Sequence, residues 1–203
     1  MKRALSLSFL ALFLLLGVSS MAQDPPHSHE HDEANGAQAN EMDPKAKIKL
    51  LLSAHCSFPT RDELLAVTDD VASILIELYE DPASIPSLRT RAIDALGWFQ
   101  EDATANFFEQ VLTRPETPER ELHHAISAYN KAFGDLAVPT TVVFLNHSDV
   151  QLRLTAVDAL GKNGGKAAQA VLLERQAREV DPVVSEKLQR AIRTPVLETP
   201  VAQ

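Results

Sequence analysis

Apolar residues recur along most of the chain with the spacing of amphipathic α-helices. Residues at i, i+4, i+7 and i+8 lie on one face of a helix. Two segments place only apolar residues at these positions: Leu88, Ala92, Ala95 and Leu96, and Leu152, Ala156, Ala159 and Leu160. The helical pattern continues from residue 45 almost to the end of the chain, so the sequence predicts an all-α domain over residues 45–194.

The pattern also repeats along the chain. Three segments share the motif Ala-apolar-x-Ala-large, and their first alanines, which we call the register alanines, are Ala92, Ala125 and Ala156. The steps between them are 33 and 31 residues, and a weaker fourth match places Ala191 a further 35 residues on. Periods of this length are typical of helix pairs that stack into a solenoid. We therefore predict a short α-α superhelix of about four helix pairs.

In each pair a first helix carries the register alanine and a second helix follows it. Gly97, Gly134 and Gly161 are predicted to lie just past the first helices, where a left-handed residue often ends a helix. Asp102 is predicted to cap a second helix. Three groups of residues are predicted to form the apolar faces of the second helices: Phe107, Phe108, Val111 and Leu112; Val142, Val143, Phe144 and Leu145; and Ala168, Val171, Leu172 and Leu173.

Cap residues and prolines predict where helices begin. A cap residue followed by proline favours a helix start, and such signals stand before the expected first helices at Thr117-Pro118, Asp149 and Asp181-Pro182. Upstream, Thr60 and Glu63 have the spacing of a capping box, and Asp70 is placed to cap a helix over residues 71–80. These signals predict a first helix pair between residues 45 and 81 that departs from the repeat motif, and a last helix over residues 182–193.

Both ends of the chain differ from its helical part. Residues 1–22 have the pattern of a secretory signal peptide, because Lys2 and Arg3 precede an apolar run and Ser20-Met21-Ala22 offers small residues at the cleavage site. An uncleaved anchor helix is the alternative. Residues 23–44 and 195–203 are expected to be disordered, since the first is too polar to bury a core. We expect an exported protein, periplasmic or extracellular, without a membrane segment after cleavage.

Charge narrows the range of partners. The chain carries 19 Lys and Arg against 28 Asp and Glu, a net charge of -9, and loss of Lys2 and Arg3 would make it -11. Such a balance argues against binding nucleic acid or an anionic membrane surface, and it leaves protein partners and cations open. The single cysteine, Cys56, excludes an internal disulfide and is predicted to be buried.

A histidine-rich stretch is the sharpest chemical feature of the predicted arm over residues 23–44. His27, His29 and His31 alternate with polar residues, and acidic residues follow. Imidazole suits Zn²⁺, Cu²⁺ and Ni²⁺, so this arm could hold a metal loosely, although a structural zinc site needs four placed ligands. The alternative is a solvated polar leader without a ligand. No other cofactor is predicted.

The remaining polar motifs favour structural roles. His123 and His124 are neighbours on one helix and cannot chelate the same ion, so one is predicted at the core boundary and the other exposed. Residues 161–166, GKNGGK, lack the spacing of a phosphate-binding loop and are predicted to be a turn between helices. Two pairs of charged residues occupy equivalent repeat positions and could form a ladder between neighbouring units: Asp94 and Asp158, and Arg89 and Arg153.

The segment DVQLRLTAVDALGKNGGKAA, which begins at Asp149, resembles a bacterial HEAT-like repeat of the phycobilisome-lyase type. The segment from Leu88 to Gly97 is similar, and the one at Glu121 departs from the pattern at Tyr129 and Asn130. The resemblance covers roughly residues 70–193. It implies an α-α superhelix whose second helices line a concave ligand face, and it implies a scaffold in most cases, with chromophore lyases or cofactor-loading factors as a minority.

These observations together predict a scaffold and not an enzyme. The leading hypothesis is an exported HEAT-repeat protein that binds a protein or peptide along one face, and exposed ends of a short solenoid also favour self-association. Metal binding by the His-rich arm is a second hypothesis. The third, an accessory lyase or cofactor-loading factor, requires a pocket in which His, Asp or Arg side chains converge, and the sequence alone assembles none.

Overall fold

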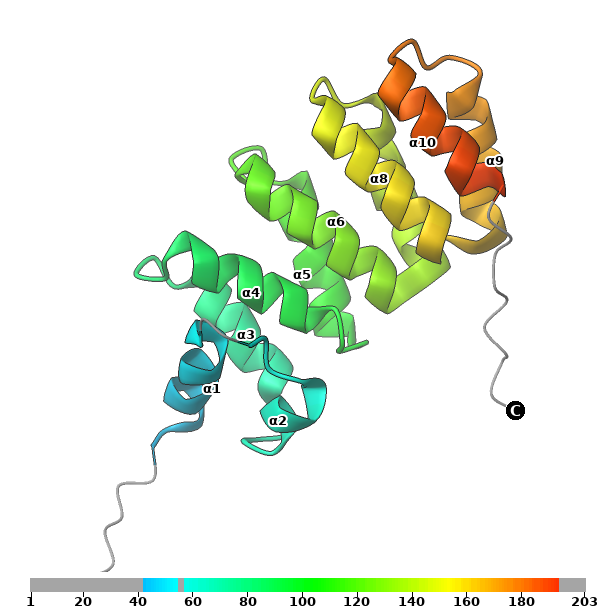
Figure 1. Cartoon of the computed structure of the whole chain (residues 1–203). Helices are drawn as coiled ribbons and strands as arrows, with labels where there is room; N and C mark the ends of the chain where they lie inside the picture. Colours follow the sequence, from blue (N-terminus) through cyan, green and yellow to red (C-terminus); the bar gives the residue numbers. More distant parts are fainter. Residues whose placement is uncertain (1–41, 55–56, 194–203) are drawn as a thin grey trace, which may run out of the picture. The chain divides into compact units, whose positions relative to one another are not determined.

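The computed structural model describes residues 42–54 and 57–193, and within these ranges the protein is all-helical, without a strand. Figure 1 shows the helices in order along the chain. Their bounds are α1 Pro44–Ser53, α2 Arg61–Leu65, α3 Val71–Glu80, α4 Pro86–Leu96, α5 Asp102–Thr113, α6 Glu119–Phe133, η1 Gly134–Ala137, α7 Val138–Thr141, η2 Val142–Asn146, α8 Val150–Asn163, α9 Gly165–Gln176 and α10 Pro182–Arg193. None of these helices has the length and apolar composition needed to cross a membrane.

The first helices lie side by side. Helix α4 packs against α6, α6 against α8, and α8 against α10, so residues about 30 positions apart meet across each junction (Figure 1). Helices α3, α5 and α9 pack against helices of this row. The register alanines Ala92, Ala125 and Ala156 are fully buried in the shared core. Their small side chains allow the helices to approach closely.

The described helices confirm several of the predicted starts. Thr60 and Glu63 form both hydrogen bonds of a capping box before α2. The side chain of Asp149 accepts a hydrogen bond from the Leu152 amide at 2.8 Å, and Asp181 accepts from the second and third residues of α10. Helix α1 begins at Pro44, one residue before the predicted domain boundary.

Two predicted starts were displaced by one residue. Asp102 does not cap α5 but is its first helical residue, and Glu101 precedes it without a side-chain cap. Helix α6 begins at Glu119, so Pro118 precedes the helix instead of opening it. Thr117 is turned inward, where its hydroxyl donates to the Val111 carbonyl at 2.7 Å. A hydrogen bond back to the preceding helix has taken the hydroxyl that the local pattern assigned to capping.

The predicted position just past a helix was correct for Gly97 and Gly134, and the left-handed conformation was correct for Gly134 alone. Gly134 ends α6 with φ of 53°, the left-handed region that favours glycine. Gly97 follows α4 with right-handed dihedral angles, and Gly161 lies inside α8. These two glycines serve close packing instead. A Cβ on Gly97 would lie 3.2 Å from the Ala128 Cβ, and one on Gly161 would lie 2.7 Å from the Ala191 Cβ.

The prediction for the second helices was correct for α5 and wrong in part for the others. All four residues predicted for the apolar face of α5 are buried. Residues 142–145 do not form a regular helix, because the chain after Gly134 breaks into η1, α7 and η2, and Val143 is 61% exposed. On α9, Ala168 and Leu172 are buried but Leu173 faces outward.

The fourth register position was predicted three residues too late. Gly161 packs against Ala191 as Gly97 packs against Ala128, which makes Ala191 equivalent to Ala128. The register residue of α10 is therefore Leu188, which is fully buried as the register alanines are. The corrected steps between register residues are 33, 31 and 32 residues, since 188 − 156 is 32. The corrected repeat is more regular than the predicted one.

Candidate functional site

One buried position of the repeat carries a charge in a single helix. The residues four positions before the register residues are Leu88, Glu121, Leu152 and Val184, and all four are buried. Three of them are aliphatic, as a core position requires. Glu121 is only 4% exposed, although a carboxylate is costly to bury unless it is paired and hydrogen-bonded. Its partners therefore define the polar centre of this part of the molecule.

Glu121 is held by two side chains, one from α3 and one from α4. The hydroxyl of Tyr79, on α3, donates to Glu121 Oε2 at 2.7 Å. Arg89 Nη1, on α4, lies 3.9 Å from Glu121 Oε1, and its guanidinium also lies over the Tyr79 ring at 5.6 Å from the centroid. Arg89 Nη2 donates to the Asp81 carbonyl at 3.4 Å. The network thus joins α3, α4 and α6 at one point.

The environment of Tyr79 follows from this arrangement. Burial raises the pKa of Tyr79 well above its ordinary value, and the hydrogen bond to Glu121 raises the pKa further. Both effects disfavour a second negative charge beside the Glu121 carboxylate. Tyr79 therefore stays a neutral donor.

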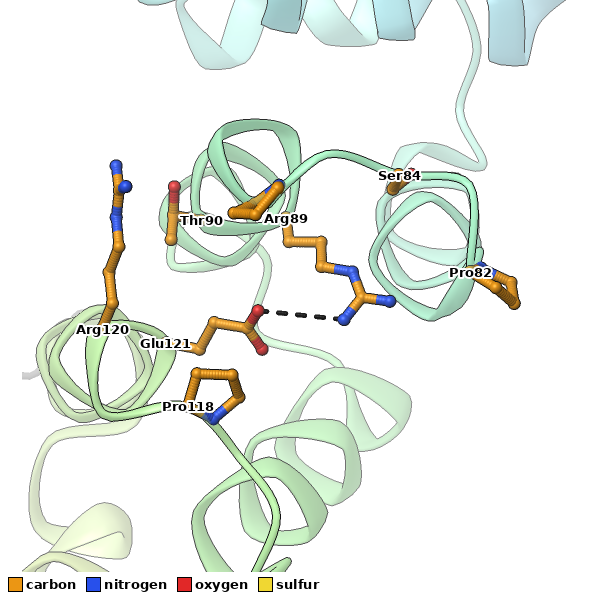
Figure 2. A pocket seen from close by; sticks show the side chains of 8 residues that line it. Pro82, Ser84, Arg89, Thr90, Pro118, Arg120 and Glu121 are labelled. Carbon is orange, nitrogen blue, oxygen red and sulfur yellow. Dashed lines mark ion pairs between the residues drawn. The ribbon is translucent and has the colours of Figure 1, made fainter.

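A pocket of about 360 Å³ lies against this network (Figure 2). The α3–α4 loop, the start of α4 and the start of α6 contribute its lining: Pro82, Ser84, Pro86, Arg89, Thr90, Pro118, Arg120 and Glu121. In Figure 2, Arg89 and Glu121 point toward one another, whereas Arg120 extends away from them, alongside Thr90. The pocket is therefore walled by three proline rings and by side chains of both charges.

Several polar groups around the pocket lack partners. Ser84 is 7% exposed, and its Oγ has no hydrogen-bond partner among the described residues. Within the same ranges, no hydrogen bond or ion pair engages the exposed guanidinium of Arg120. The amino-terminal ends of α4 and α6 also lack a side-chain cap. The Ser84 hydroxyl and the Arg120 guanidinium are therefore donors that no acceptor of the described chain engages, whereas the Leu88 and Glu121 amides at these helix ends donate to the Ile85 and Pro118 carbonyls.

The residues predicted to bind metal are not among those that the structure describes. His27, His29 and His31 fall outside the described residues, and so does Cys56. Within residues 42–54 and 57–193, no three His, Cys, Asp or Glu side chains are placed to hold a metal ion. Metal binding by the arm therefore stays a prediction.

The predicted ladder of charged residues is present at two junctions. Asp94 Oδ1 is hydrogen-bonded to His124 Nδ1 at 2.7 Å between α4 and α6, and Asp158 is ion-paired with Lys187 between α8 and α10. Both cross-junction partners stand one residue before a register residue. At the α6–α8 junction, His123 Nδ1 instead contacts the Thr155 hydroxyl at 2.7 Å. The prediction of one exposed histidine was wrong, because both are partly buried by these contacts.

Arg89 and Arg153 hold the loop before their helix in the same way. Arg89 donates to the Asp81 carbonyl, and Arg153 donates to the carbonyls of His147 and Ser148 at 2.8 and 2.9 Å. Arg153 also lies 3.6 Å from the buried carboxylate of Glu179. Residues 161–166 hold no phosphate-binding loop: they end α8 and begin α9, with Gly164 between the helices.

Sequence reasoning missed Glu121 and Tyr79 as site residues. Glu121 was identified only as the start of the third repeat, and its alignment with Leu88 and Leu152 was a signal that could have been used. A carboxylate at a position that is otherwise aliphatic predicts a buried polar contact. Nothing in the local pattern identifies Tyr79 as its partner, since the two residues are 42 positions apart.

No protein family model matches this chain, and no curated protein matches it either. The resemblance to HEAT-like repeats therefore stays a prediction from the residues that carry it. The geometry of the pocket is the main basis for a functional argument.

Proposed function

We propose that this chain is an exported scaffold of HEAT-like repeats that binds a protein or peptide segment. The side-by-side packing of α4, α6, α8 and α10, with α5 and α9 as second helices, supports a solenoid of helix pairs. Stacked repeats of this kind offer extended surfaces for partners. The pattern of a signal peptide over residues 1–22 supports export.

The pocket between α4 and α6 is the observation that carries the proposal. The pocket lies at the helix junction where Glu121 stands in place of the aliphatic residue of the other repeats. The Ser84 hydroxyl and the Arg120 guanidinium, which line it, have no acceptor among the described residues. Sites that depart from local rules of folding are often functional sites. A binding role accounts for the pocket without a reaction, because neither an imidazole nor a thiol is among its lining residues.

Two other functions remain separate hypotheses. The pocket does bring Arg and Glu side chains together, as a cofactor-loading factor would need, but its lining carries no residue set of a lyase. Loose binding of Zn²⁺ or Cu²⁺ by His27, His29 and His31 is independent of the pocket. Titration of the mature chain with Zn²⁺, with and without substitution of these three histidines, tests it directly.

Affinity capture tests the scaffold. Residues 23–203 and residues 42–203 would be immobilised and exposed to envelope extract of the source organism, and the retained proteins would be identified by mass spectrometry. The shorter chain keeps Asp43, which caps α1 through a bond from the Ala46 amide, and circular dichroism would verify its folding.

A specific protein retained by both chains, and competed by soluble chain, would support binding through the helical part. If neither chain retained a specific protein, the scaffold proposal would be contradicted. A partner retained only by the longer chain would place recognition in residues 23–41 instead.

A further inference from the structure

We propose that the pocket between α4 and α6 binds a carboxylate that is attached to a small apolar group. This inference rests on the proposed function, because a peptide of a partner is one source of such a carboxylate. A small organic acid is the other source.

The charges of the lining favour a single negative charge. Arg89 and Arg120 outnumber Glu121, so the lining carries a net charge of +1 in a chain whose net charge is -9. Glu121 is already engaged by Tyr79 and Arg89, and its side chain is 5% exposed. Arg120 is exposed and has no ion-pair partner among the described residues. A carboxylate matches this excess charge, whereas a doubly charged phosphate would be repelled by Glu121.

The uncharged donors also suit a carboxylate. Ser84 Oγ has no acceptor although the residue is more than nine-tenths buried, and an unsatisfied buried hydroxyl is costly. The amino-terminal ends of α4 and α6 both contribute to the pocket, and neither has a side-chain cap. Backbone amides and the helix dipole at such ends stabilise an anion. Ser84 provides the independent sign that an acceptor is missing.

The walls of the pocket limit the size and the polarity of the group that is attached to the carboxylate. Pro82, Pro86 and Pro118 line the pocket with apolar rings and offer no backbone N–H. Proline also fixes its own backbone angle, so little conformational entropy is lost when a ligand enters. The volume of about 360 Å³ lies at the lower end of small-ligand pockets and suits one apolar residue and its carboxylate.

Titration of the mature chain, followed by amide chemical shifts in NMR, tests this inference. Four probes separate the sources of the carboxylate: acetyl-Ala-Leu with a free carboxyl terminus, the same dipeptide amidated, an amidated acetyl-Leu-Glu, and isovalerate. We expect the first probe to bind, with shifts confined to residues around Ser84 and Arg120, and the amidated dipeptide to bind at least about tenfold more weakly. Binding of the third or fourth probe would identify an acidic side chain or a free acid as a source.

Two variants and one control assign the binding to this pocket. Arg120→Gln should weaken the best probe about tenfold, and Ser84→Ala should weaken it about threefold. Ser84→Ala should not lower the thermal midpoint of unfolding, because it removes an unsatisfied hydroxyl, so a loss of binding would not be a loss of folding. Lys49→Gln, at an exposed position of α1, removes the same charge as Arg120→Gln and should bind as the unmodified chain does.

The inference is overturned if none of the three carboxylate probes binds, if the amidated dipeptide binds equally well, or if both pocket variants bind like the unmodified chain. The scaffold can survive that result. A partner captured equally by the unmodified chain and by Arg120→Gln would keep the proposed function and place its binding surface outside this pocket. If the unmodified chain captured the partner and Arg120→Gln did not, both the proposed function and the carboxylate site would be supported.

Discussion

The junctions α4–α6 and α8–α10 are built alike, whereas the junction α6–α8 between them is not. In the first two, a glycine five residues after the register residue meets an alanine of the next helix, at Gly97 and Gly161. In both, an aspartate two residues after the register residue contacts a side chain of the next helix. At the middle junction these positions hold Asn130 and Ser127.

The middle junction uses different contacts to reach the same packing. Asn130 is fully buried, and its Nδ2 donates to Thr141 Oγ1 at 2.7 Å and to the Ile126 carbonyl at 2.8 Å. It therefore ties α6 to α7 within its own pair. Close approach to α8 shifts to Gly134, where a Cβ would lie 3.2 Å from the Asn163 carbonyl oxygen. The comparison shows that close packing and charge pairing are separable functions of the repeat.

Helix α6 also differs from α4 and α8 in burying a carboxylate, Glu121, and a carboxamide, Asn130, whereas the buried polar residue of α4 is Thr90. Glu121 is the extreme case, and Glu121→Ala should cause the largest loss, about 3 kcal/mol of unfolding free energy. The Tyr79 hydroxyl would lose its acceptor and Arg89 its carboxylate. Equilibrium urea unfolding of residues 23–203 measures the loss, with the exposed Glu119→Ala on the same helix as control. A loss below about 1 kcal/mol would mean that Glu121 is incidental to the fold.

The second largest effect is expected on the stability of the chain at alkaline pH, which depends on the hydrogen bonds of two buried tyrosines. The chain has two tyrosines: Tyr79 bonds to Glu121, and Tyr129 bonds to Glu109 at 3.0 Å. Burial and these hydrogen bonds raise the pKa of both, that of Tyr129 to about 12. Because the unfolded pKa is about 10, the stabilisation is complete below that pH and is lost as the pH rises above it.

At about pH 11 the native chain should therefore show little tyrosinate absorption, and unfolding in urea should release that of both residues. The near-ultraviolet spectrum records this directly. Substantial ionisation of the folded chain at that pH would contradict the buried hydrogen bonds. The variant Tyr129→Phe separates the contribution of Tyr79.

The two similar junctions should differ in tolerance of an added methyl group. Gly161→Ala should destabilise the chain by about 1 kcal/mol, because overpacking against Ala191 outweighs the gain in helix propensity. Gly97→Ala should cost less, since its Cβ would meet Ala128 at 3.2 Å instead of 2.7 Å. Urea unfolding of both variants ranks them. The reverse order would show that α10 yields more easily than α6.

The smallest effect is expected from the ion pairs of the α8–α10 junction. Burial alone would raise the pKa of Asp158, but hydrogen bonds and charges from Lys162 and Lys187 hold it below its ordinary value. This stabilisation is present above about pH 4 and is lost as the pH falls below that value. Asp158→Asn should therefore cost at most about 1 kcal/mol at neutral pH, less in high salt, and nothing in acid. An equal cost at both pH values would contradict an electrostatic origin.

The features that the sequence predicted correctly depend on residues close together in the chain. The apolar face of α5, the capping box at Thr60 and the cap at Asp149 each involve residues within about one to three turns. The all-helical class follows from the same short-range period. Predictions failed where a contact outside the expected helix competed. The Thr117 hydroxyl bonds back to Val111 at the end of the preceding helix, and Gly161 faces Ala191 on α10.

The sequence by itself determined that the chain is helical, that its helices repeat about every 32 residues, and that charged residues recur at fixed repeat positions. Only the tertiary structure decided which carboxylates are buried, which donors lack acceptors and where a pocket opens. The physical reason is the distance along the chain. Tyr79, Arg89 and Glu121 come from three helices. Their energies depend on burial and geometry that no short-range pattern encodes.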